Sequence, residues 1–307
     1  MSLSLNITNF ALRLVVKAVQ IGPLRPMLIR RTVNVLAKAM PVPKWATHTS
    51  IPANPALGLC PAEWISVAQP ERTILYFHGG GYFFCGLRSH RPSCAHLARH
   101  AKARVLSVDY RMAPEHTCPA AVEDAVAWWK ELLRQGVNPA DVVFAGDSAG
   151  AGLAAACLVA AKAQGLPMPA GAVLYSPMAD MSCSGESMVS NAKTDVMFSA
   201  RMIPQAAALY LGGRASTDPL ASPVFANLRG LPELLIFASE SELLMSDSVR
   251  LHENAREAGI ACTLILRPGM PHVWPIIVHL PEAQADLRLS AQFIARVTAL
   301  PQQAMAA

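Results

Sequence analysis

Short apolar runs alternate with helix-forming stretches over most of the chain. The runs that predict strands are residues 64–68, 73–77, 104–108, 142–145, 172–175, 234–238 and 263–266. Between them lie stretches with helical spacing of apolar positions, namely residues 92–102, 120–134, 149–163, 247–258 and 282–297. This alternation predicts an α/β fold with a largely parallel central sheet and helices on both of its faces.

Two segments depart from this alternation. Residues 1–45 predict two amphipathic helices, separated near Gly22 and Pro26 and followed by further prolines. Residues 181–211 are polar at first and then helical, which predicts an insertion over the edge of the sheet. We therefore expect an N-terminal helical segment, 1–45, and one main domain, 46–307, that carries the insertion.

The first predicted helix has an apolar face with basic flanks. Apolar residues near helical spacing are Phe10, Leu14, Val15 and Val19, and the flanking cations are Arg13 and Lys17. One hypothesis is attachment to a membrane surface, because a basic amphipathic helix favours anionic lipid. The other is a cap that packs over the main domain together with residues 181–211. Both structures need an apolar face, so the spacing does not decide between them.

Composition narrows the choice of function. A chain of 307 residues with 52% hydrophobic content can bury a large core. Charged residues make up only 15%, which leaves apolar surface for a lid or for an interface such as that of a homodimer. Seven of the 26 Lys and Arg residues lie in 1–45, where no acidic residue occurs, and the other 19 face 21 acidic residues. A nearly neutral main domain argues against nucleic acid as the partner.

The cysteines and the apolar runs indicate the cellular compartment of the protein. The seven cysteines are scattered without a Cys-x-x-Cys pair, which favours reduced thiols in a cytoplasmic protein over disulfides or a zinc site. The apolar stretch 3–19 is interrupted by Arg13 and Lys17 and is not preceded by a charged start, so we do not expect a signal peptide. The apolar runs are also too short to predict a membrane-spanning helix.

A candidate nucleophile lies between a predicted strand and a predicted helix. Residues 146–150 read Gly-Asp-Ser-Ala-Gly, a G-x-S-x-G motif in the strand–turn–helix setting of a nucleophile elbow. A tight turn there would expose the Ser148 hydroxyl at a helix N-terminus, which favours developing negative charge. The alternative is a glycine-rich turn in which Ser148 only caps the helix.

A second glycine-rich loop could stabilise an anion. Residues 78–81 read His-Gly-Gly-Gly and directly follow a predicted strand. Unshielded backbone N–H groups in such a loop could hold the oxyanion of a tetrahedral intermediate. The alternative is a flexible turn, but its position upstream of Ser148 favours the catalytic interpretation. We expect a structural role for His78.

A serine nucleophile requires a base and an acid further along the chain. His272 is the best base, because it lies in the loop after the last predicted strand, where a doubly wound sheet presents its catalytic groups. The acid should follow the strand 234–238, where Glu240, Glu242 and Asp247 are candidates. Asp247 could instead cap a helix and Glu240 could be a loop charge, so the spacing leaves the acid open.

Four collinear motifs together resemble the hormone-sensitive-lipase family, in its branch of bacterial esterases with Asp before the nucleophilic serine. The motifs are residues 78–81, 109–116, 146–150 and 218–223, followed by the Pro-His pair at 271–272. The resemblance covers roughly residues 60–298 and implies an α/β-hydrolase fold and hydrolysis of small-molecule carboxylic esters without metal or cofactor.

The resemblance also implies roles for individual residues. Ser148 would be the nucleophile and His272 the general base, and the N–H groups of Gly79, Gly80 and Ala149 would form the oxyanion hole. Where the family usually has Asp-Pro-Leu, this chain has Glu-Leu-Leu at 242–244. Some members use Glu, so Glu242 is the implied acid. Related esterases build a cap from the two regions that correspond to 1–45 and 181–211, which favours the cap hypothesis.

Two other functions compete with a short- to medium-chain esterase. A membrane-associated lipase for long-chain esters would explain the basic N-terminus and the low charge content. A ligand-binding receptor is the other alternative, because the plant gibberellin receptors resemble the same family but lack the catalytic histidine. This chain retains His272, which argues against the receptor.

Overall fold

An eight-stranded sheet forms the centre of the computed structural model, which describes residues 2–18, 20 and 22–298. The strands are β1 (Thr47–Ile51), β2 (Ala62–Ser66), β3 (Arg72–Phe77), β4 (Ala103–Val108), β5 (Val142–Asp147), β6 (Gly171–Tyr175), β7 (Glu233–Ser239) and β8 (Cys262–Arg267). Their order is β1-β2-β4-β3-β5-β6-β7-β8, and only the β1–β2 and β2–β4 pairs are antiparallel. The predicted largely parallel sheet is confirmed.

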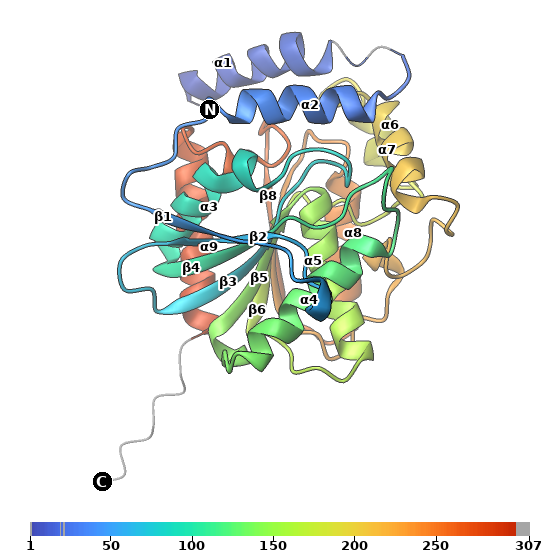
Figure 1. The fold of residues 1–307 in the computed structure, drawn as a ribbon. Helices are drawn as coiled ribbons and strands as arrows, with labels where there is room; N and C mark the ends of the chain where they lie inside the picture. Colours follow the sequence, from blue (N-terminus) through green and yellow to red (C-terminus); the bar gives the residue numbers. More distant parts are fainter. Residues whose placement is uncertain (1, 19, 21, 299–307) are drawn as a thin grey trace.

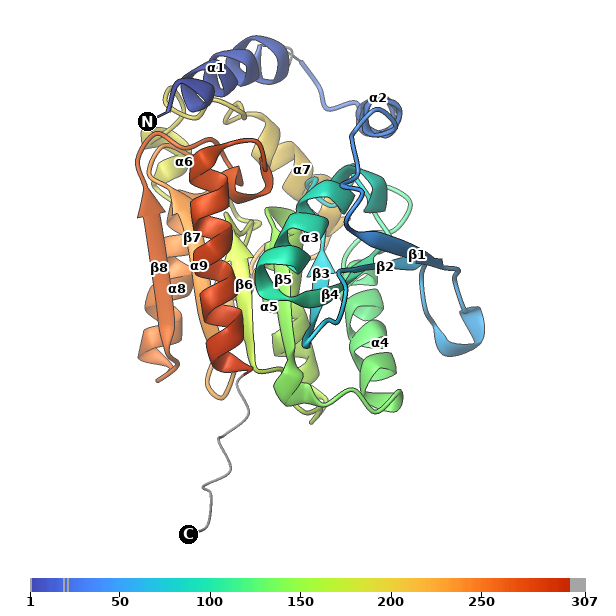
Figure 2. The same cartoon turned by 90° about the vertical axis from the view of Figure 1, so that its left-hand side faces the viewer.

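Helices cover both faces of the sheet (Figures 1 and 2). The helices are α1 (Leu3–Ala11), α2 (Pro26–Ala37), α3 (Leu87–Ala101), α4 (Ala120–Arg134), α5 (Ala149–Ala163), α6 (Ser187–Ser190), α7 (Met202–Leu211), α8 (Met245–Glu257) and α9 (Pro281–Val297). One buried cluster joins α4, α5 and α8 to the sheet, and a second joins α3 and α9 to its other face. Alternation along β3 divides its side chains between the two clusters, with Leu75 in the first and Ile74 in the second.

The N-terminal helices lie beyond the carboxyl ends of the parallel strands (Figures 1 and 2). Asn9 of α1 donates a hydrogen bond to the carbonyl of Gly269, which follows β8. Arg30 of α2 donates to the carbonyl of Phe83, which follows β3. Both helices are therefore attached to the loops in which a doubly wound sheet carries its functional groups.

Three details differ from the sequence prediction. Thr47–Ile51 forms β1 at the edge of the sheet, although no strand was predicted there, and its exposure explains why no apolar alternation marks it. The helix expected to start at Pro92 starts at Leu87 and contains Pro92 in its interior. The N-terminal apolar positions Phe10 and Leu14 are exposed, so the apolar face does not point toward the main domain.

Candidate active site

Ser148 forms a strained turn between β5 and α5. Its backbone angles are φ 54° and ψ −121°, a conformation rarely adopted by residues with a side chain, costing of order 1–3 kcal/mol. The Ser148 N–H donates to the carbonyl of Tyr175 over 2.8 Å, and its own carbonyl accepts from the N–H of Met178 over 3.0 Å. Ser148 precedes α5 but its side chain makes no capping hydrogen bond. The hydroxyl is thus not committed to the helix end.

The glycines that flank Ser148 are required by close packing. A Cβ atom at Gly146 would contact the carbonyl oxygen of Gly150. A Cβ atom at Gly150 would contact the carbonyl oxygen of Phe77, the last residue of β3. The motif therefore allows α5 to start directly against the neighbouring strand, which fixes the turn at Ser148.

His272 and Glu242 form a buried pair. The distance from His272 Nδ1 to Glu242 Oε2 is 2.9 Å, and the two residues are only 2% and 1% exposed. Burial by itself would lower the pKa of His272, but the Glu242 carboxylate, assisted by Asp195, raises this pKa above its ordinary value. The His272 Nε2 atom is buried and meets no hydrogen-bond partner among the described residues. The ring therefore has one nitrogen paired with a carboxylate and the other free.

The loop that carries His272 is bonded to the strand beside the Ser148 turn. Val273 has the left-handed angles φ 54° and ψ 32°, which are unusual for a β-branched residue. Its N–H donates to Ser176 Oγ over 3.1 Å, and Ser176 directly follows the residue whose carbonyl binds the Ser148 N–H. The ring of Phe198 lies 5.1 Å from the ring of His272, edge to face. The 181–211 segment thus contacts the candidate base directly.

The two other candidate acids lie elsewhere. The N–H of Glu240 donates to the carbonyl of Arg267 in β8, and the Glu240 residue is exposed. The Asp247 Oδ2 atom accepts the N–H groups of Ala179 and Asp180, both over 2.9 Å. Burial raises the pKa of Asp247 to about 7. The alternative role of Asp247 as a helix cap is wrong, because α8 already begins at Met245.

The glycine loop after β3 offers different donors from those expected. The Gly79 N–H donates to Asp147 Oδ1 over 3.1 Å, so it is already engaged. Within the part of the chain that the structure describes, no acceptor meets the N–H groups of Gly80, Gly81 or Ala149. The Gly79 N–H, which the resemblance assigned to an oxyanion hole, is therefore already bonded, and this contradicts a free donor at that position.

The buried carboxylate of Asp147, next to the candidate nucleophile Ser148, holds this loop. Besides Gly79, the Asp147 carboxylate accepts from Tyr76 Oη over 2.7 Å and lies 3.3 Å from His90 Nε2. Burial favours the protonated acid, but His90 and the Tyr76 hydroxyl hold the pKa of Asp147 below its ordinary value. Asp147 lies inside the motif of residues 146–150, but the motif does not reveal that its carboxylate binds the glycine loop.

His78, at the start of the glycine loop, packs against Tyr110. Its ring stacks on Tyr110 at 4.3 Å, and the Tyr110 hydroxyl donates to the His78 carbonyl over 2.6 Å. Burial, together with the neighbouring His90, lowers the pKa of His78 to about 4. A neutral, stacked ring fits the structural role expected for this residue.

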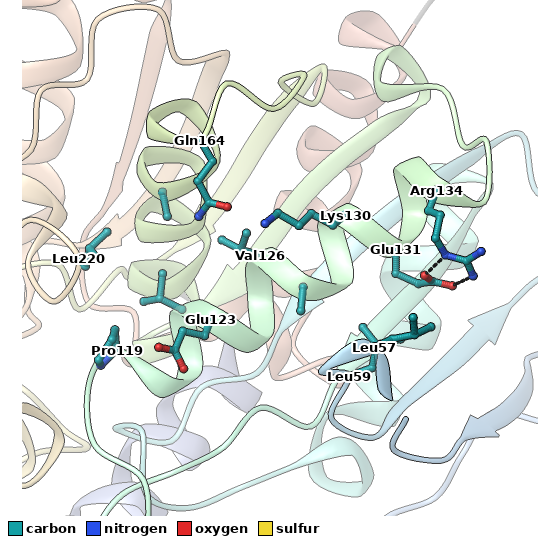
Figure 3. A pocket seen from close by; sticks show the side chains of 13 residues that line it. Leu57, Leu59, Pro119, Glu123, Val126, Lys130, Glu131, Arg134, Gln164 and Leu220 are labelled. Carbon is teal, nitrogen blue, oxygen red and sulfur yellow. Dashed lines mark hydrogen bonds and ion pairs between the residues drawn. The ribbon is translucent and has the colours of Figure 1, made fainter. Parts of the chain in front are cut away.

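A groove elsewhere on the surface is separate from these residues. It has a volume of about 500 Å³ and runs beside α4, with Val126 and Leu220 among its apolar lining residues (Figure 3). The charged residues Glu123 and Lys130 also line it, but no serine, cysteine or histidine does. The groove therefore offers no nucleophile and no base for ester chemistry.

Among residues 2–18, 20 and 22–298, no set of three or more His, Cys, Asp or Glu residues is arranged to hold a metal ion. None of the helices within those residues is long and apolar enough to cross a membrane.

Comparison with known proteins agrees with this geometry. A family model described as the alpha/beta hydrolase fold matches residues 74–276. An acetyl-hydrolase of Streptomyces hygroscopicus is 41% identical over 247 residues, which cover 79% of this chain and 82% of that protein. An esterase of Acinetobacter venetianus is 33% identical over 252 residues, with 79% and 83% covered. The crystal structure of an esterase from the bacterial hormone-sensitive lipase family matches with a TM-score of 0.91 and 36% identity, over 97% of this chain and 99% of that one. The chain belongs to the hormone-sensitive-lipase family of α/β-hydrolases.

Proposed function

We propose that this carboxylic ester hydrolase acts on esters of short- to medium-chain acids through Ser148, His272 and Glu242. The observation that carries the proposal is the buried 2.9 Å contact between His272 Nδ1 and Glu242 Oε2. A carboxylate at Nδ1 favours the tautomer with the proton on that nitrogen, which leaves Nε2 free to accept another. His272 Nε2 is then the atom that takes the proton of the Ser148 hydroxyl.

The reaction proceeds in two acyl-transfer steps. The Ser148 oxygen attacks the ester carbonyl carbon while its proton passes to His272, and Glu242 stabilises the imidazolium that forms. The tetrahedral intermediate collapses when His272 protonates the leaving alcohol, which leaves an ester between the acyl group and Ser148. Water then attacks this ester and gives a proton to His272, and the acid departs as Ser148 recovers its proton.

Backbone N–H groups would hold the oxyanion. Gly80, Gly81 and Ala149 are the donors that remain without an acceptor within the described part of the chain, and Ala149 is the first residue of α5. A donor aimed at the developing charge is worth about 3–4 kcal/mol in such a site, and a helix N-terminus adds to the favourable field. In this proposal Gly79 positions the loop through Asp147 instead of touching the substrate.

The segments 1–45 and 181–211 would form a cap over the site. Lys17 Nζ donates to the carbonyls of Ala192 and Asp195, over 2.9 and 2.6 Å. Gln20 donates to the carbonyl of Met197 over 2.9 Å and accepts from the N–H of Ser199 over 2.9 Å. The two segments are thus bonded to each other, and the second reaches His272 through Phe198. Such an enclosure supports the preference for short to medium acyl chains.

The cysteines support a cytoplasmic location. All seven are free thiols, and burial raises the pKa of Cys60 to about 12. Free, scattered thiols favour a reducing compartment over an oxidising one. We propose no metal or cofactor for the reaction, because a Ser–His–acid site needs neither.

The proposal is tested with an acyl-chain series of p-nitrophenyl esters, from acetate to palmitate, on wild-type protein and on Ser148→Ala. We expect kcat/KM to peak among the short and medium chains and to fall for the micellar palmitate ester. Ser148→Ala should lose several orders of magnitude in kcat while its circular dichroism spectrum is retained, because triad residues act as a unit. A maximum on micellar palmitate would replace the proposed substrate class, and an active Ser148→Ala variant would overturn the mechanism.

A further inference from the structure

The outer face of the N-terminal helices is apolar and largely exposed. On α1 and the π-helical turn that continues it (Leu12–Lys17), Leu3, Ile7, Phe10 and Leu14 are 76%, 61%, 65% and 56% exposed. Their spacing of four, three and four residues places them along one side of the helix. The opposite side is attached to the protein, since Leu5 is fully buried.

The second helix presents a similar outer face. Leu28, Val35 and Leu36 of α2 are 55%, 63% and 63% exposed, whereas Ala37 is buried. The inner side of α2 is fixed by Arg30, which donates to the carbonyl of Phe83 after β3 and to that of Ala113 after β4, and which forms an ion pair with Glu115. Both helices lie at the same end of the molecule, above the loops that carry the site (Figures 1 and 2).

The segment that carries these apolar side chains is also basic. The exposed basic residues of the segment are Arg13, Arg25, Arg31, Lys38 and Lys44. No ion pair is formed by any of these five within the described ranges 2–18, 20 and 22–298. The segment itself has no acidic residue, and the nearby carboxylate of Glu282 accepts hydrogen bonds from Ser2. The face therefore combines exposed apolar area with uncompensated positive charge.

Exposed apolar area together with positive charge indicates which partner binds this face. If a second copy of the chain packed on this face by two-fold symmetry, two equally basic faces would meet. Repulsion between their like charges would destabilise such a dimer. An anionic lipid surface complements both features, because the apolar side chains enter the acyl boundary while Lys and Arg meet the headgroups. We propose that the outer face of α1 and α2 docks on a membrane surface that contains anionic phospholipid.

The docked orientation would direct the capped end of the protein toward the lipid. Lys17 and Gln20 hold the segment to the 192–199 backbone, and none of the exposed apolar side chains takes part in those hydrogen bonds. The proposal does not depend on the ester chemistry, since binding to vesicles is measured without turnover. It combines the two hypotheses for residues 1–45, with contacts to the second cap segment on one side and lipid on the other.

Vesicle sedimentation tests the proposal. Full-length protein is mixed with vesicles of phosphatidylcholine alone or of phosphatidylcholine with phosphatidylglycerol, at low salt and at 0.5 M salt. We expect at least tenfold tighter binding to the anionic vesicles, weakened by salt. The apolar variant Phe10→Ser with Leu14→Ser, and the charge variant Arg31→Glu with Lys38→Glu, should each lose at least tenfold in affinity. The matched control is Leu57→Ser with Lys130→Glu, which alters one exposed apolar residue and one exposed cation beside α4.

Thermal unfolding followed by circular dichroism checks that every variant is folded. Absence of wild-type binding to the anionic vesicles would overturn the proposal, as would equal affinities of the face variants and the control. Sedimentation equilibrium without lipid tests whether a second copy of the chain binds this face instead. Self-association that the Phe10 and Leu14 substitutions abolish, with no vesicle binding, would identify a second copy as the occupant and reject the lipid surface.

Discussion

Replacement of Glu242 by Gln is the sharpest perturbation of the proposed site. The substitution preserves the size of the side chain but removes the negative charge 2.9 Å from His272 Nδ1. Both residues are buried, so neither solvent nor salt compensates for the lost charge. The loss should appear mainly in kcat, because the His272 imidazolium that Glu242 stabilises forms only during the chemical steps and not on substrate binding.

The structure bounds the size of the effect. A hydrogen bond to a charged group contributes about 1.5–3 kcal/mol, which corresponds to a loss of roughly 10- to 150-fold. Coulomb attraction at this separation with an effective dielectric constant of about 20 amounts to about 6 kcal/mol, or roughly 10⁴-fold. We therefore expect kcat of Glu242→Gln to fall by about one to four orders of magnitude.

The assay is steady-state hydrolysis of a soluble p-nitrophenyl ester over a range of pH. Because Glu242 raises the pKa of His272, the substitution should also move the inflection of the kcat/KM profile to lower pH, which a merely structural defect would not do. The matched controls are Glu240→Gln and Asp247→Asn, which change carboxylates that do not contact His272. Retention of more than a tenth of wild-type kcat by Glu242→Gln, or an equal loss in Asp247→Asn, would refute the assignment.

Three further predictions follow from the site and its cap. In the wild-type protein, kcat/KM should rise with pH through an inflection above ~6.5, since His272 must be neutral to act and its pKa is raised. An inflection below ~6.5 would contradict the pairing of His272 with Glu242. EDTA should leave the rate unchanged. Lys17→Ala with Gln20→Ala should raise KM several-fold and weaken chain-length selectivity on soluble esters, and unchanged kinetics would reject the cap. Asp147→Asn should lower the free energy of unfolding by about 1.5–3 kcal/mol at neutral pH, measured by urea denaturation. The pKa of Asp147 is depressed in the folded protein, so its carboxylate stabilises the fold above pH ~4, and this stabilisation disappears as the pH falls through the folded pKa. If wild type and Asp147→Asn still differed in unfolding free energy in acid, the prediction would be contradicted.

The sequence predicted most of the fold because the buried parallel strands are marked by apolar runs. The run 142–145 became β5, and the alanine-rich stretch 149–163 became α5, whose residues are buried almost throughout. Ser148 and His272 were placed correctly at the carboxyl ends of strands, since loop position follows from the β–α alternation. The strand β1 was missed because its residues are exposed and lack apolar alternation.

Other features depended on contacts between distant residues. Spacing could not select among Glu240, Glu242 and Asp247, and only the resemblance favoured Glu242, which the structure brings to His272. The hydrogen bond from Gly79 to Asp147 joins residues 68 apart in sequence, so neither the glycine pattern nor the resemblance showed that the Gly79 N–H is already engaged. Helical periodicity showed that residues 1–45 contain an apolar face, but not that Phe10 and Leu14 point outward. Val19, assigned to the same face, lies outside the described residues.

The most direct test of the central claim is the site of covalent labelling by an organophosphate ester. The wild-type protein is treated with the reagent, and the intact mass and the peptide masses are measured, with Ser148→Ala as the control. We predict one adduct, located on Ser148, whose formation abolishes hydrolysis of soluble esters and does not occur in Ser148→Ala. An adduct on another serine, or full activity of protein labelled at Ser148, would contradict the account.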